Sequence, residues 1–272
     1  MDRPEIIAHL FYPTRMPKTP LPAGAFDFDI PVSDGDTVAC RLHSAGPDAA
    51  IVLFFHGNGE TIADYDEIAP LFLAEGLGVL FAEYRGYGWS TGSPRTSALL
   101  PDANAVFVHG RTRLHELGFT GPIVVMGRSL GSACAIEVAA EHGSELAGLI
   151  IESGFARTIP LGKTLGIDLE ALGIGEEQLF NNAHKIEQVT LPTLLLHGQH
   201  DQLIPLWQAE TLHVASGAQT KELRIVPGAD HNTVMLIAGR LYFQTIRQFI
   251  AQATGTAEDW RARRRRFKAE NS

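Results

Sequence analysis

The chain has 272 residues, of which 45% are hydrophobic and 19% are charged. This balance is typical of a globular protein with a large core, and we expect one domain over residues 1–272. The formal net charge of -9 argues against a general affinity for nucleic acid or anionic membranes, which demand a basic face. The only two cysteines, Cys40 and Cys134, lie in apolar segments and indicate neither a disulfide framework nor a metal site.

The C-terminal residues 260–272 depart from the acidic balance and form a basic tail. Its cations are Arg261, Arg263, Arg264, Arg265, Arg266 and Lys268. Such a run can bind acidic surfaces or nucleic acid, but nothing elsewhere in the chain extends the basic patch, so a solvated tail is expected. No apolar run reaches transmembrane length, and the first residues lack the pattern of a signal peptide. We therefore expect no integral membrane segment and a cytoplasmic location.

The first regular structure is predicted to be an antiparallel hairpin. Apolar residues alternate with polar ones on both sides of the turn at Asp34-Gly35, which is the period of a half-buried strand. The alternating residues are Phe26, Phe28 and Ile30 before the turn and Val38, Cys40 and Leu42 after it.

Short apolar runs then alternate with longer amphipathic stretches. This pattern predicts an α/β fold: a mostly parallel eight-stranded sheet with helices on both faces. The six strands that follow the hairpin are expected at 51–55, 79–81, 123–126, 149–151, 194–196 and 223–226. The helices are expected at 61–75, 101–117, 130–142, 206–215 and 233–253.

The interval 155–190 is longer than a usual connection and mixes glycines with helical fragments, so a small cap insertion is predicted there. Its apolar residues fit two interpretations, an acyl-binding surface or simple packing of the cap on the core. They are Leu161, Leu165, Ile167, Leu169, Leu172 and Ile174.

The segment Gly127-Arg128-Ser129-Leu130-Gly131 contains the G-x-S-x-G pattern of a nucleophilic serine. It follows a predicted strand and precedes a run of small and apolar residues, which gives it strand-turn-helix context. On such a sharp turn the hydroxyl projects above the sheet edge, and the two glycines let the backbone double back without Cβ clashes. We predict Ser129 as the nucleophile; the alternative is a serine that only caps the following helix.

The segment Phe55-His56-Gly57-Asn58-Gly59 closes an earlier strand, so it emerges at the same sheet edge as the serine. Acyl transfer places negative charge on a carbonyl oxygen, which backbone N–H groups fixed in advance can stabilise. The predicted donors are the N–H groups of Asn58 and Leu130. An ordinary strand-to-helix turn is the alternative, and His56 is expected to be a buried structural histidine.

Position selects the base among eleven histidines. His231 follows the last predicted strand, where a loop at the carboxyl edge can carry its imidazole to Ser129. A helix-capping or surface histidine is the alternative.

The acid should lie between the serine and the base in the chain, and Asp201 meets this condition just after the strand at 194–196. An Asx turn or a helix cap near Pro205 is the alternative reading of Asp201. Glu152 is the reserve acid, and Asp230 is weaker because adjacent side chains rarely face each other. His197 and His200 lack further ligands, so no metal site is expected.

These motifs together resemble the α/β-hydrolase superfamily, in particular its compact serine-hydrolase branch of small esterases, thioesterases and serine-aminopeptidase-like proteins. The resemblance also rests on Tyr84-Arg85-Gly86-Tyr87-Gly88, where Arg85 is read as a scaffold residue that anchors a carboxylate or carbonyl, with a contact to substrate as the alternative. The sequences of this loop and of the serine turn resemble those of the abhydrolase-domain group, whose better-known members remove acyl groups from proteins or lipids. Gly59-Glu60 departs from the alanine-containing sequence common in that group, so the rim of the oxyanion loop is expected to differ.

The sequence therefore predicts hydrolysis of a carboxylic ester or thioester through an acyl-enzyme. Ser129 attacks, His231 transfers the proton, Asp201 orients His231, and Asn58 and Leu130 stabilise the oxyanion. The expected partner is a small-molecule or acyl substrate, and the mechanism needs no metal or organic cofactor. Amide or peptide hydrolysis, or a binding protein that kept the fold without catalysis, remain open alternatives.

Overall fold

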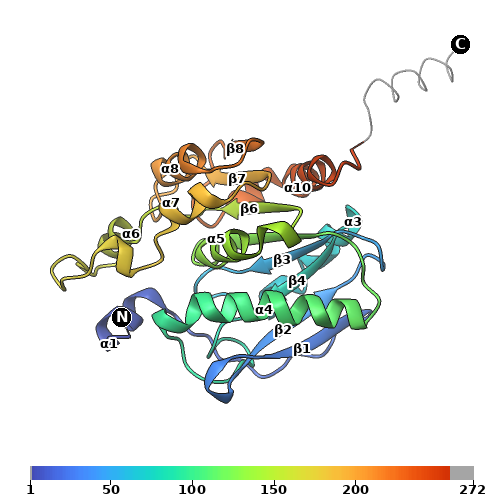
Figure 1. The fold of residues 1–272 in the computed structure, drawn as a ribbon, viewed down its shortest axis with the longest axis horizontal. Coiled ribbons are helices and arrows are strands. Elements are labelled where there is room, and N and C mark those ends of the chain that lie inside the picture. The colour runs from blue at the N-terminus through green and yellow to red at the C-terminus, as the bar shows by residue number, and fades with distance from the viewer. Residues whose placement is uncertain (1, 258–272) are drawn as a thin grey trace, which may run out of the picture.

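A computed structural model describes residues 2–257, arranged as one eight-stranded sheet between two layers of helices (Figure 1). The strand order is β1-β2-β4-β3-β5-β6-β7-β8. The basic tail predicted at 260–272 lies outside the described residues. The strands are β1 (Ala25–Pro31), β2 (Thr37–His43), β3 (Ile51–Phe55), β4 (Gly78–Ala82), β5 (Ile123–Arg128), β6 (Gly148–Glu152), β7 (Thr193–Gly198) and β8 (Lys221–Val226).

The N-terminal hairpin is confirmed, and it is the antiparallel part of the sheet. β1 pairs antiparallel with β2, and β2 pairs antiparallel with β4, whereas the strands from β4 through β8 run parallel to their neighbours. Asp34 and Gly35 both adopt a positive φ in the short 3-10 turn η1 (Ser33–Gly35), which reverses the chain. All parallel strands end at one edge, so the loops after them meet there.

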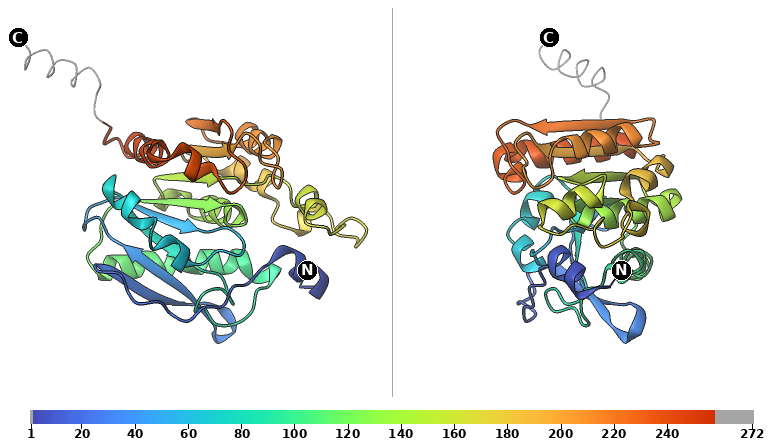
Figure 2. Two further views of the ribbon diagram at one scale, coloured as in Figure 1. Left: turned by 180° about the vertical axis from the view of Figure 1, so that it is seen from behind. Right: turned by 90° about the vertical axis from the view of Figure 1, so that its left-hand side faces the viewer.

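Alternating residues of the strands pack against different helices, which is why the apolar runs are continuous. Leu53 and Phe55 of β3 lie in the core formed with α4 (Thr96–Glu116), α5 (Gly131–His142) and α8 (Trp207–Ala215). Val52 and Phe54 lie in the core formed with α2 (Ile62–Tyr65), α3 (Ala69–Ala74), α9 (Val234–Ala238) and α10 (Arg240–Ala253). The two layers are visible on opposite faces of the sheet in Figure 2.

Three predicted helices differ from the observed ones, each at a proline or glycine. The helix expected at 61–75 is two short helices, because Pro70 lies in the first turn of α3 and cannot donate a backbone hydrogen bond to a preceding turn. The helix expected at 233–253 is broken at Gly239, which adopts a φ of 53° between α9 and α10. The helix expected to start at Pro101 starts at Thr96, with the proline held inside α4.

The chain between β6 and β7 forms a segment of short helices, here called the β6–β7 segment (residues 153–192). It contains α6 (Thr158–Thr164), η3 (Glu176–Gln178), α7 (Asn182–Lys185) and η4 (Ile186–Gln188). The N-terminal helix α1 (Pro4–Leu10), which the sequence analysis missed, lies at the same end of the molecule (Figures 1 and 2). The Arg3 guanidinium donates to the carbonyl of Leu172 at 3.1 Å, which links the two.

Candidate active site

Ser129 lies on a strained turn between β5 and α5. Its φ is 52°, a conformation that side chains other than glycine rarely adopt. A Cβ at Gly127 would collide with the backbone of Gly131, and a Cβ at Gly131 would collide with the carbonyl of Phe55. The two glycines therefore allow three backbone segments to touch. The Ser129 side chain does not cap α5, whose N-cap position is Leu130.

A chain of hydrogen bonds joins Ser129 to His231 and Asp201. The distance from Ser129 Oγ to His231 Nε2 is 2.9 Å, and that from His231 Nδ1 to Asp201 Oδ2 is 2.7 Å. All three residues are at most 7% exposed. A donated Nδ1–H fixes the imidazole tautomer, and the Nε2 lone pair then faces the serine hydroxyl. The structure thus brings together the three residues that the sequence analysis selected from separate strand ends.

The two oxygens of Asp201 have separate partners. Oδ1 accepts the backbone N–H groups of Leu203 at 3.0 Å and Ile204 at 2.8 Å, which is an Asx turn. Oδ2 accepts from His231. The turn and the histidine contact were treated as alternatives from the sequence, and the structure contains both. The turn fixes the carboxylate in the orientation that the histidine requires.

The amides predicted as oxyanion donors flank the serine turn. Within residues 2–257, the N–H groups of Asn58 and Leu130 donate to no other protein atom. The Asn58 side chain is fixed from three sides, because Oδ1 accepts from Tyr12 N at 2.9 Å and Tyr87 OH at 2.6 Å while Nδ2 donates to Leu10 O at 3.0 Å. Leu10 and Tyr12 thus hold the loop that carries the Asn58 N–H group, which is unbonded within the described residues.

His56 is a buried structural histidine, as predicted. Its Nε2 is 2.9 Å from Glu83 Oε2, and its Nδ1 is 2.8 Å from the carbonyl oxygen of Gly57. Burial acts to lower the pKa of His56, but the hydrogen bond and charge of Glu83, together with the Gly57 carbonyl and the Glu60 charge, outweigh burial and raise the pKa above its usual value. An imidazolium satisfies both acceptors at once. The Gly57 carbonyl belongs to the peptide group that carries the Asn58 N–H, so His56 orients that peptide.

The other candidate residues have different partners. Glu152 contacts Arg128 and Tyr242, and Asp230 caps an exposed turn through Asn232 N and Thr233 Oγ1. His197 is buried with Nε2 2.8 Å from the carbonyl oxygen of Ile204, and burial lowers its pKa. In the described part of the chain, no group of three His, Cys, Asp or Glu residues is arranged to hold a metal ion.

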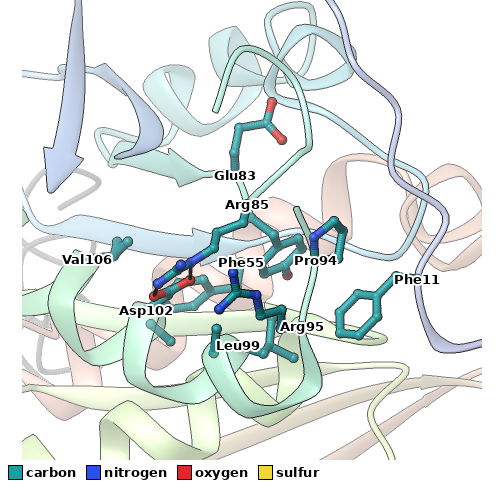
Figure 3. A pocket seen from close by; sticks show the side chains of 12 residues that line it. Phe11, Phe55, Glu83, Arg85, Pro94, Arg95, Leu99, Asp102 and Val106 are labelled. Carbon is teal, nitrogen blue, oxygen red and sulfur yellow. Dashed lines mark hydrogen bonds and ion pairs between the residues drawn. The ribbon is translucent and has the colours of Figure 1, made fainter. Parts of the chain in front are cut away.

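A small pocket lies between α4, Phe11 near the N-terminus and the end of β4 (Figure 3). Its volume of about 10 Å³ is near the minimum for one water, so it is too small for a substrate. At its polar end Arg85 forms a bidentate pair with Asp102, with N–O distances of 2.6 and 2.7 Å. Arg85 is therefore an anchor of the scaffold, as the sequence analysis predicted.

Two parts of the site were missed from the sequence. The first is the N-terminal segment, in which Leu10 and Tyr12 bond to the Asn58 side chain. The second is Arg128, which precedes Ser129 and contacts Glu60, Glu152 and the His231 loop. Pro4 and the spacing of Ile6 and Leu10 are a helix signal that the analysis did not use. No local signal exists for the partners of Arg128.

Among residues 2–257, no helix is both long and apolar enough to cross a lipid bilayer.

A mostly parallel sheet in this strand order, with a Ser-His-Asp chain at its carboxyl edge, defines the class of α/β-hydrolase folds. A family model described as serine aminopeptidase, S33, matches residues 46–167. The protein bem46 of Schizosaccharomyces pombe is 30% identical over 217 residues, which cover 78% of this chain and 71% of bem46. An uncharacterized protein of Mycobacterium tuberculosis is 29% identical over 238 residues, covering 85% of this chain and 81% of that protein.

Among solved structures, an esterase of Pyrococcus furiosus superposes with a TM-score of 0.72 at 18% identity, covering 88% of this chain and 98% of the esterase. The chain belongs to the α/β-hydrolase superfamily.

Proposed function

We propose that this protein is a serine hydrolase that cleaves a carboxylic ester or thioester through an acyl-enzyme. The observation that carries the proposal is the hydrogen-bonded chain from Ser129 Oγ through His231 to Asp201, with distances of 2.9 and 2.7 Å. Membership of the α/β-hydrolase superfamily supports a hydrolase activity, and the fold shared with an esterase agrees with it.

In the first half of the reaction, Ser129 Oγ attacks the carbonyl carbon of the substrate and His231 Nε2 accepts the hydroxyl proton. The Asp201 carboxylate stabilises the resulting imidazolium. The N–H groups of Asn58 and Leu130 are in our proposal the donors to the oxyanion. The tetrahedral intermediate collapses when the leaving alcohol or thiol takes the proton from His231, which leaves the acyl group on Ser129.

In the second half, water attacks the acyl-enzyme and His231 again accepts a proton. Collapse of the second tetrahedral intermediate releases the carboxylic acid and returns the proton to Ser129 Oγ. These steps use only side chains and backbone groups of this chain. In this proposal the β6–β7 segment is the cap that receives the acyl group, since it is inserted immediately after the strand beside the nucleophile.

Amide or peptide hydrolysis is the second candidate, because the matching family model is described as serine aminopeptidase. The same side chains cleave an amide when His231 protonates the leaving amine. Parallel turnover of matched esters, thioesters and aminoacyl amides separates the candidates, and turnover of the amides alone would replace the first proposal.

The decisive variant is Ser129→Ala, with Ser144→Ala as a control on an exposed turn remote from the site. We expect Ser129→Ala to lower kcat on short p-nitrophenyl esters by about 10⁶-fold, as loss of a nucleophilic serine does. It should also abolish labelling by a fluorophosphonate, whereas Ser144→Ala should keep both. Full activity of Ser129→Ala would refute the assignment. A folded wild type that neither labels nor turns over would favour a binding protein.

A further inference from the structure

Arg128 is a buried cation that precedes Ser129 in the chain and contacts three other segments of the site. It ends β5 and is 7% exposed. Every nitrogen of its guanidinium has a partner: Nη1 pairs with Glu60, Nε lies 3.3 Å from Glu152 Oε1, and Nη2 donates to the His231 loop. The partners come from the oxyanion loop, the end of β6 and the loop after β8.

The first link runs from Arg128 to the oxyanion loop. Glu60 Oε1 pairs with Arg128, while Glu60 Oε2 accepts the Gly57 N–H at 2.7 Å and the Tyr65 hydroxyl at 2.7 Å. Burial opposes ionisation, but the Arg128 charge, the hydrogen bonds from Tyr65 and Gly57 and the His56 charge together outweigh it and lower the pKa of Glu60. Glu60 is thus an ionised bridge between the guanidinium and the backbone that precedes the Asn58 amide.

The second link runs from Arg128 to the backbone of the base. Nη2 donates to the His231 carbonyl oxygen at 3.0 Å and to Asn232 Oδ1 at 3.0 Å. The imidazole extends from this same residue to Ser129 Oγ. Movement of the His231 backbone therefore moves Nε2 relative to the serine, and Arg128 restrains that movement.

The chemistry of this cluster favours a positioning role over a stabilising one. Removing a guanidinium and two carboxylates from water costs free energy that their mutual attraction often fails to recover, so buried ion clusters are poor stabilisers. What an arginine offers is a rigid planar fork with donors in several fixed directions. Here the donors of Arg128 reach Glu60 in one loop and the His231 carbonyl in another. A lysine ammonium has a single nitrogen and cannot bond to both loops in the same way.

We infer that Arg128 is a positioning residue that fixes the Asn58 amide and His231 relative to Ser129 from beneath the turn. This inference rests on the proposed function, since it assigns no reaction of its own. The hydrogen bonds and ion pairs of its guanidinium go to Glu60, Glu152, Asn232 and the His231 carbonyl, and none goes to Ser129 Oγ or the His231 imidazole. It acts through Glu60 on one side and through the His231 carbonyl on the other.

The test compares Arg128→Gln, Arg128→Lys and Asn232→Ala, with Arg41→Gln as the matched control. Arg41 is fully buried and pairs with Asp27 and Asp66, but it lies on β2. Active sites are first counted by exhaustive fluorophosphonate labelling, and kcat and KM for a short ester are then measured per labelled site. This count removes molecules that have not folded.

We expect Arg128→Gln to lower kcat per labelled site by about 10²-fold, the loss that a displacement of about 1 Å causes. KM should change little, because ground-state binding does not depend on the oxyanion amide. Arg128→Lys should retain the charge and recover part of kcat, and exposed Asn232→Ala should show a smaller loss. Arg41→Gln should lower the melting temperature while kcat per site stays at the wild-type value.

The outcomes separate this inference from the proposed function. If Ser129→Ala abolishes turnover but both Arg128 variants keep wild-type kcat per labelled site, the positioning role is wrong and the hydrolase assignment stands. If Arg128→Gln does not fold, Arg128→Lys and Asn232→Ala decide by the same measurement. If Ser129→Ala keeps activity, the proposed function fails first, and the Arg128 inference fails with it.

Discussion

The loops at the carboxyl edge of the sheet and the β6–β7 segment are held in place in different ways. At the edge, side chains are fixed by buried polar contacts, such as Asp201 with His231 and Arg128 with the His231 carbonyl. In the β6–β7 segment, Gln208 holds the first residues by hydrogen bonds, whereas beyond them Leu161 and Leu169 pack into the main core and the ion pair of Lys163 and Glu170 lies exposed in solvent. Directional contacts fix positions closely, whereas apolar packing tolerates change. In the proposed function, chemistry and substrate choice therefore depend on differently constrained parts of the molecule.

The largest expected effect, after loss of the serine, is at Asp201. Asp201→Asn retains the size of the side chain and its Asx turn, but it presents the wrong hydrogen-bonding group to His231 or selects the wrong tautomer. We expect kcat for ester hydrolysis to fall by about 10⁴-fold, with KM little changed. Steady-state kinetics on a short ester measures both.

The control for Asp201→Asn is Asp230→Asn. Asp230 adjoins His231 in sequence but only caps an exposed turn, and asparagine keeps the accepting oxygen. Near wild-type kcat is expected. An equal loss of kcat in both variants would mean that activity does not depend specifically on the contact between Asp201 and His231.

Gln208 tests the other region, because it holds the first residues of the β6–β7 segment from helix α8. Its Oε1 accepts from Ala156 N at 3.0 Å and Arg157 N at 2.9 Å, and its Nε2 donates to Arg157 O at 3.1 Å. Gln208→Ala leaves these groups unpaired, which should cost about 1–3 kcal/mol of stability.

For activity, we expect Gln208→Ala to raise KM for esters of long acyl chains while kcat on short esters stays near wild type. A panel of esters of graded chain length, combined with urea unfolding, checks both parts. A fall in kcat on every ester with KM unchanged would show that the segment positions the reacting groups, and the division between the two regions would be lost.

The sequence was sufficient to predict which residues meet at the edge of the sheet, because that depends on the place of each residue after a parallel strand. Ser129, Asp201 and His231 each follow an apolar run, and all parallel strands end at one edge, so the meeting of these residues required no knowledge of side-chain packing. For Asp201, the sequence offered an Asx turn and a contact with His231 as alternatives. A carboxylate has two oxygens, so one side chain makes both contacts.

The missed features depend on contacts between distant positions. Arg128 is 68 residues from Glu60 and 103 from His231, and the Asn58 side chain bonds to Leu10, 48 residues away. Hydrophobic periodicity carries no information on such pairs. The errors in helix bounds have a local cause, since Gly239 and Pro70 are breakers that a continuous apolar period concealed.

The smallest expected effect concerns the pH dependence of stability at the carboxyl edge. Because the folded-state pKa of His56 is raised above 6.5, its pair with Glu83 stabilises the fold fully below pH 6.5 and loses this contribution as the pH rises through the folded-state pKa. Removing the carboxylate leaves burial opposed only by the Gly57 carbonyl and the Glu60 charge, so the dependence should shrink or reverse in Glu83→Gln.

Melting temperatures of the wild type and Glu83→Gln between about pH 6 and 9 should therefore converge as the pH rises. His184→Gln is the matched control in the β6–β7 segment, where His184 pairs with Glu187 in an exposed position; its difference from wild type should stay small at every pH, because exposed pairs contribute little. Parallel curves for wild type and Glu83→Gln would contradict the charged pair.

Neutral His56 has one N–H for two acceptors, Glu83 and the Gly57 carbonyl, so the same titration that weakens the fold releases the peptide that carries the Asn58 amide. If kcat falls at alkaline pH to the same extent in the wild type and in His184→Gln, but to a different extent in Glu83→Gln, the buried pair of His56 and Glu83 is connected to the chemistry at the edge of the sheet.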